Sequence, residues 1–385
     1  MQRAKKYSLD NNIIFLILLC LIPISQVFSY IISKDMSVDY IAYPSIIIFY
    51  FLVNKKINSI KSAIVVIIFL IYTFFFSNNN LTGRAGYMIG FVLTIASLLI
   101  LPDIYFYKKF YRKIFIDRVM VVLCYSIMVI YFLTGNIWTD VSGTRNYFSG
   151  YIIPHAFSYY MSVFVYYFLM CSKKRYAIFP FLSGVLMGTR TGFLINFISL
   201  AAFFFTLMSR NNIINIFKFI IISIIILLIL FTFIPELRLQ LLNIGESLSI
   251  FLTSLVGNNN DLEDNSSRRS LLFTIGFNQI KKDGFAIENI IGRGPRSSYE
   301  FIGSTTGMNL WFHNDLVEIM YSLGIVNLIL YLLSIFYYCI KTKSFFFFLY
   351  LFIAILLNGF FLYASFTIIA IHYLAKYSLI HDFVS

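Results

Sequence analysis

The chain has 385 residues, of which 59% are hydrophobic and only 12% are charged, and its formal net charge is +13. The apolar residues form long blocks, and a single soluble core cannot bury so much apolar surface. The composition therefore excludes a soluble globular domain and indicates a polytopic membrane protein.

Twelve apolar segments follow one another along the chain, each judged against the ~20 residues that cross a bilayer. Their approximate bounds are 12–33, 38–53, 61–76, 86–102, 118–134, 152–171, 177–188, 191–208, 217–234, 316–340, 344–358 and 361–375. We therefore expect an all-α polytopic membrane protein of about twelve transmembrane helices with one large, external and partly helical loop. Its predicted divisions are transmembrane helices 1–9 in 1–234, the external loop in 235–315, and helices 10–12 with a cytoplasmic C-terminus in 316–385.

The basic residues predict the orientation of these helices. Most of the 30 lysines and arginines lie in alternate short loops, and the positive-inside rule places such loops, with both termini, in the cytoplasm. Their expected partners are anionic lipid headgroups, and nothing in the sequence indicates a nucleic-acid partner. No Walker A or GxGxxG loop occurs, so chemistry driven by bound nucleotide is not predicted.

Arginine outnumbers lysine in the predicted external loops, whereas lysine is the commoner cation in the cytoplasmic ones. The planar guanidinium suits bidentate capture of phosphate, so this asymmetry indicates an anionic ligand on the outer side. The alternative is that these arginines only meet the headgroups of the outer leaflet.

The motif MGTRTGFLINF at 187–197 interrupts an apolar stretch from Ala177 to Met208. Two full crossings need about 40 residues, more than this stretch offers, so we expect GTRTG to break the chain below the outer surface. Arg190 would then be recessed in the membrane, which makes it a functional candidate; the alternative is an arginine that reaches up to the interface.

The external loop contains a second arginine-rich region. The stretch SSRRSLLFTIGFNQIKKDG predicts a helix that Ser266 or Ser267 caps and that ends at Gly284. Arg268 and Arg269 fall in its first turn, where the helix dipole disfavours cations unless an anion lies nearby. The segment IIGRGPRSS follows and adds two further arginines.

The stretch LWFHNDLVEIMYSLG at 310–324 opens the tenth predicted span. Asp315 and Glu318 fit a D-x-x-E capping arrangement, which explains both acids without any chemistry. That arrangement leaves His313 and Asn314 unexplained, and a histidine at a helix N-terminus on the membrane surface could be structural or functional.

The order of these motifs resembles the bacterial O-antigen polymerase (Wzy) and O-antigen ligase superfamily. The resemblance covers roughly 140–335, and it rests on SGTRNYFSGYIIPHAFSYY at 142–160, GTRTGFL at 188–194, SRRSLLF at 267–273, IIGRGP at 291–296 and HNDLVEIMYSLGIVNLILYL at 313–332. The chain has Pro154-His155 where the family pattern has Pro-Asn. The N-terminal third resembles the family in topology alone.

The resemblance implies a metal-independent glycosyltransferase, without a cofactor, at the outer face of the bacterial inner membrane. Its donor would be an oligosaccharide on a polyprenyl diphosphate, and its acceptor another repeat unit of an O-antigen or capsule. The implied catalytic residues are His313 as base or phosphate ligand, Arg190 and Arg269 on the diphosphate, and Glu318 as fallback base. The implied substrate-binding residues are Arg145, Arg268, Arg293, Arg296 and Asn314.

Two alternatives remain open at this level. A ligase would transfer the glycan to a lipid A core, and no residue separates it from a polymerase, which we prefer because its reaction occurs in more envelope pathways. A lipid-linked oligosaccharide flippase would be expected to show paired half-repeats and midplane charges, which are not evident here. A chain-length regulator protein is a further expected partner of a polymerase.

Overall fold

The computed structural model describes residues 84–107, 137–139, 146–148, 154–170, 174–186, 194–201, 203, 268–307, 310–342, 350, 354–356, 359, 361 and 371, and all structural statements concern these. The described part is helical except for one pair of short antiparallel strands, β1 (Ile137–Thr139) and β2 (Asn146–Phe148), in which Ile137 faces Phe148. The labelled helices are α4 (Arg84–Tyr107), α6 (Pro154–Met170), α7 (Lys174–Leu186), α11 (Arg268–Asp283), α12 (Ile287–Ile291), α13 (Ser297–Thr306) and α14 (Asp315–Thr342), and residues 194–201 are helical as well.

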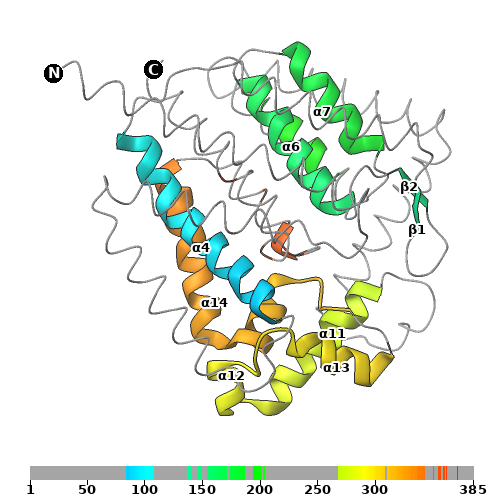
Figure 1. The fold of residues 1–385 in the computed structure, drawn as a ribbon, viewed down its shortest axis with the longest axis vertical. Helices are drawn as coiled ribbons and strands as arrows, with labels where there is room; N and C mark the ends of the chain where they lie inside the picture. The colour runs from blue at the N-terminus through cyan, green and yellow to red at the C-terminus, as the bar shows by residue number, and fades with distance from the viewer. Residues whose placement is uncertain are drawn as a thin grey trace, which may run out of the picture.

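The helices gather in two groups (Figure 1). Helix α6 packs against α7, while α4 runs beside α14 and the three shorter helices α11, α12 and α13 surround the N-terminal end of α14. Predicted spans at 86–102, 152–171, 177–188 and 316–340 coincide with α4, α6, α7 and α14 within a few residues, and the helix predicted in the external loop is confirmed as α11. The twelve-span count and the orientation fall largely outside the described residues and stay predictions.

Helix α14 is the one helix, among the described residues, that is long and apolar enough to cross a membrane. Its exposed side chains are apolar except Lys341 at the C-terminal end, and its buried ones include most of its polar groups, the reverse of a helix on a soluble protein. The exposed set is Ile325, Val326, Ile329, Leu332, Leu333, Phe336 and Ile340, and the buried polar set includes Asp315, Glu318, Ser322, Asn327, Ser334 and Thr342. This inversion is what a lipid-facing helix requires, because lipid tails solvate apolar side chains and leave polar ones to the protein interior.

A sharp bend at Gly324 divides α14. Gly324 has φ 85° and ψ 168°, a backbone conformation that only glycine adopts readily. The bend is needed for the hydrogen bond of 2.8 Å between the Tyr331 hydroxyl and Asp315 Oδ2, because residues 16 apart lie about 24 Å apart along a straight helix. Residues 315–323 therefore turn back toward the long segment 325–342.

The bend also receives the loop after α12. A Cβ on Gly324 would lie 2.3 Å from the Ile290 carbonyl oxygen, and the Gly294 amide donates to the Ser322 carbonyl at 2.9 Å. The backbone of the loop after α12 therefore contacts the backbone of α14 directly, with no side chain between them. This contact ties the helical cluster α11–α13 to α14.

Replacing Gly324 by alanine is expected to lower the free energy of unfolding by at least about 2 kcal/mol, since the backbone strain alone costs ~1–3 kcal/mol and the clash adds to it. Denaturant titration in detergent measures this. Gly307→Ala is the matched control, because Gly307 has φ 72° but open space around its Cβ direction. An equal loss in both variants would mean that the contact with Ile290 contributes nothing.

Candidate functional site

The residues that lead into α14 present His313 at the surface. His313 adopts the left-handed conformation at φ 54°, and its half-buried imidazole lies 4.4 Å from the Trp311 ring, centroid to centroid. Trp311 is buried, and it packs so closely on Gly359 that a Cβ there would lie 2.4 Å from the indole. The imidazole therefore contacts a buried neighbour, while His313 as a whole stays partly exposed.

Asn314 is the N-cap of α14. Its Oδ1 accepts hydrogen bonds from the backbone amides of Leu316 at 3.0 Å and Val317 at 3.2 Å, and its Nδ2 donates to the Leu356 carbonyl at 3.1 Å. The prediction that Asp315 caps this helix, with Glu318 completing a capping box, is therefore wrong. Asn and Asp cap equally well, so two adjacent candidates cannot be ranked from the sequence.

Glu318 joins four segments of the chain. Its Oε1 accepts hydrogen bonds from three hydroxyls, those of Tyr87 in α4 at 2.7 Å, Ser298 in α13 at 2.6 Å and Ser322 in α14 at 3.1 Å. Its Oε2 accepts from the Phe312 amide at 3.2 Å, one residue before His313. The carboxyl group is fully buried, and no cation among the described residues pairs with it.

This geometry favours a positioning role for Glu318. A general base must reach the proton it removes, and both oxygens of Glu318 are already engaged inside the protein. Because the carboxyl group holds the backbone next to His313, it fixes the position of the imidazole. The prediction of Glu318 as fallback base receives no support from this arrangement.

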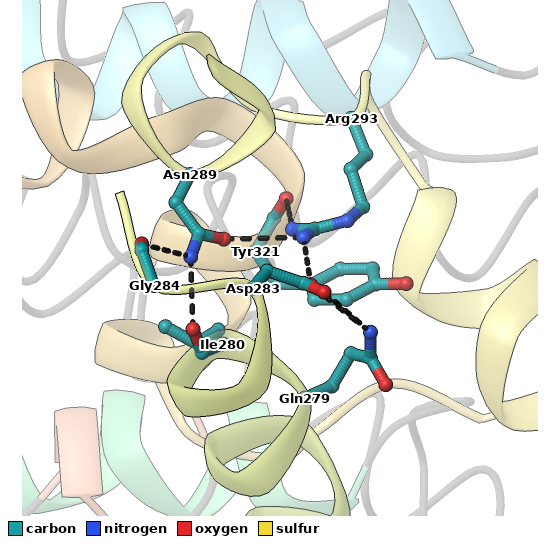
Figure 2. A network of polar contacts seen from close by, with 7 residues as sticks. All are labelled: Gln279, Ile280, Asp283, Gly284, Asn289, Arg293 and Tyr321. Carbon is teal, nitrogen blue, oxygen red and sulfur yellow. Dashed lines mark hydrogen bonds and ion pairs between the residues drawn. The ribbon is translucent and has the colours of Figure 1, made fainter. Parts of the chain in front are cut away.

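Arg293 sits at the centre of a polar network between α11, α12 and α14 (Figure 2). Its Nη2 forms an ion pair with Asp283 and donates to Asn289 Oδ1 at 3.1 Å, while its guanidinium lies 4.3 Å above the centroid of the Tyr321 ring. Asn289 in turn donates to the carbonyls of Ile280 at 2.9 Å and Gly284 at 2.8 Å. Because its guanidinium is engaged in these contacts, Arg293 holds the loop that follows α12. It is therefore poorly placed to bind an anionic ligand.

Arg296 differs from Arg293 because it is exposed. It adopts φ 64° before α13, and its guanidinium lies 4.8 Å above the centroid of the Tyr299 ring. Burial raises the pKa of the Tyr299 hydroxyl, an effect that the Glu318 charge reinforces and Arg296 opposes. Tyr299 therefore stays protonated at neutral pH and could donate a hydrogen bond.

The other predicted site residues are placed only in part. Arg268 and Arg269 begin α11, as the sequence predicts, but only their backbone is described. Arg190 and Arg145 lie outside the described residues, so their proximity to His313 stays a prediction. No group of three or more His, Cys, Asp or Glu residues suited to a metal ion occurs in the described part of the chain.

The sequence pattern did not predict the hydroxyl groups that donate to Asp315 and Glu318. These belong to Tyr87, Ser298, Ser322 and Tyr331. Each is a polar residue inside or beside an apolar run, and a buried polar group in a membrane protein needs an internal partner. That signal could have paired them with Asp315 and Glu318.

No protein-family model, curated protein or solved structure matches this chain.

Proposed function

We propose that this chain is a membrane glycosyltransferase of the polysaccharide polymerase type. It moves an oligosaccharide from a polyprenyl diphosphate to the hydroxyl of an acceptor repeat unit, at the outer face of the bacterial inner membrane. The observation that carries the proposal is the position of His313: a partly exposed residue, packed on Trp311, directly before the first turn of α14 and beside the helical cluster α11–α13, which presents Arg296.

The apolar outer face of α14 is suited to a donor that arrives within the membrane. A polyprenyl chain is solvated by lipid, so its diphosphate reaches the protein at the membrane surface, the level at which a helix such as α14 emerges. A bound diphosphate there would meet the imidazole and the neighbouring arginines.

In this mechanism the acceptor oxygen forms a bond to the anomeric carbon, and the bond from that carbon to the diphosphate oxygen breaks. His313 takes the hydroxyl proton as the new bond forms, and the diphosphate leaves on its lipid. Arg190 and Arg269 stabilise the charge that develops on the leaving diphosphate. Asn314 and Arg293 support this site by capping α14 and by fixing the loop.

Arg190→Lys tests the role of Arg190, which the sequence predicts to be recessed in the membrane. We expect loss of most polymer yield, because lysine keeps the charge but lacks the bidentate fork that matches phosphate. Arg175→Lys at the exposed start of α7 is the matched control and should leave the yield unchanged. Polymer is measured on cells that accumulate equal amounts of inserted protein, and full yield from Arg190→Lys would show that Arg190 only anchors the chain at the interface.

A further inference from the structure

The turn between α11 and α12 exposes a set of large apolar side chains. Gly284, at φ 57°, ends α11 by donating its amide to the Ile280 carbonyl at 3.1 Å. Phe285 is 100% exposed, Ile287 64% and Ile290 41%. Three large apolar side chains between 285 and 290 would be unfavourable in water, at roughly 1.5–3 kcal/mol for each that remains unburied.

One end of this apolar set, at Ile290, lies next to the bend in α14. The end of α12 meets the bend at Gly324, where the Ile290 carbonyl and the Gly292 amide approach the helix backbone. The apolar exposed face of α14 starts at the following residue, Ile325, and continues through Val326 and Ile329. The end of α12 and the start of the apolar exposed face of α14 therefore meet at the bend, and Figure 1 shows α12 below the lower end of α14.

The length of the long segment of α14 places the bend at the membrane surface. Residues 325–342 span about 27 Å at 1.5 Å per residue, close to the hydrocarbon thickness of ~30 Å. If this segment crosses the bilayer, Gly324 lies at the boundary between hydrocarbon and headgroups. The apolar residues of α12 then lie at the same boundary.

The charges around the turn fit the same environment. Lys281 and Lys282 are exposed at the last turn of α11, directly before the apolar residues, whereas Glu288 is the exposed acid on α12. Basic residues beside an exposed apolar set are typical of segments that bind the headgroup region of a bilayer.

We propose that Phe285, Ile287 and Ile290 insert into the leaflet from which α14 emerges, with Lys281 and Lys282 at the headgroups. This insertion anchors the helical cluster α11–α13 on the membrane, beside His313. The inference rests on α14 crossing the bilayer and is independent of glycosyl transfer.

Nitroxide labels on the full chain in liposomes test whether the turn between α11 and α12 inserts into the membrane. Phe285→Cys, Leu333→Cys and Ser304→Cys are made separately after Cys20, Cys124, Cys171 and Cys339 are replaced by serine. Leu333 is the lipid reference at the middle of the exposed face of α14, and exposed Ser304 on α13 is the water reference. Relaxation by oxygen, which concentrates in lipid, is compared with relaxation by a water-soluble nickel chelate.

The label at residue 285 is expected to show an oxygen-to-nickel ratio near that at 333 and opposite to that at 304, at a depth of about 5–10 Å. A ratio like that at 304 overturns the insertion while leaving α14 as a membrane helix. Access of neither reagent to 285 also overturns it and indicates cover by protein. Nickel access at 333 contradicts both the insertion and the membrane placement on which the proposed function depends.

Discussion

Glu318→Ala is expected to lower the free energy of unfolding by at least about 3 kcal/mol, since each buried donor left without an acceptor costs ~1–3 kcal/mol. Four donors lose their acceptor together: the hydroxyls of Tyr87, Ser298 and Ser322 and the amide of Phe312. The substitution also removes the hydrogen bonds that join α4, α13 and α14 at this point. Denaturant titration of purified protein in detergent measures the loss.

Two further variants complete this test. The first is a control for stability, and the second separates a positioning role of Glu318 from a catalytic one. Glu288→Ala removes an exposed acid and is expected to change stability by less than about 0.5 kcal/mol. Glu318→Gln keeps the shape, because its amide nitrogen can donate to two of the three hydroxyls and its oxygen can accept from the Phe312 amide. We expect the folded Gln variant to keep activity within about tenfold of wild type, whereas loss of a general base costs ~10²–10⁴-fold in rate. A loss in that larger range from well-folded Glu318→Gln would make Glu318 a catalytic acid or base after all.

His313→Asn is expected to abolish most transfer activity, by ~10²–10⁴-fold if the imidazole acts as base, while the protein accumulates normally. Asparagine is the sharper replacement because it tolerates the left-handed conformation that His313 adopts. The variant therefore removes the imidazole without straining the backbone. Activity is measured per amount of folded protein, as transfer from purified lipid-diphosphate oligosaccharide.

His313→Ala provides the comparison. Alanine in the left-handed region costs roughly 1–2 kcal/mol, so this variant should be equally inactive but less stable. Full specific activity in His313→Asn would show that the histidine is a surface residue that only packs on Trp311, and the proposed catalytic role would fail.

Strong, continuous patterns predicted the helices well. The apolar run at 316–340 and the stretch SSRRSLLFTIGFNQIKKDG gave α14 and α11 nearly to the residue, because length, hydropathy and the terminal Gly284 act locally along the chain. The bend at Gly324 could not be predicted in this way. A glycine inside an apolar helix is tolerated, and only the approach of α12 requires its φ of 85°.

The candidate site was predictable in its residue types but not in their partners. Arg293 looked like an anion ligand because its pairing with Asp283, ten residues earlier, depends on how α11 and α12 fold together. Glu318 looked like a cap or a base because its hydroxyl partners come from α4 and α13, far along the chain. Side chains that act across segments are set by tertiary packing, which a local pattern does not contain.

The most direct measurement follows a radiolabelled lipid-diphosphate oligosaccharide in liposomes that contain the purified chain, with EDTA and without nucleotide. We expect longer lipid-linked glycans and one free polyprenyl diphosphate for each bond formed, and neither product with His313→Asn. A donor that crosses the bilayer intact, with no longer glycan and no released polyprenyl diphosphate, would contradict the account and identify a transporter.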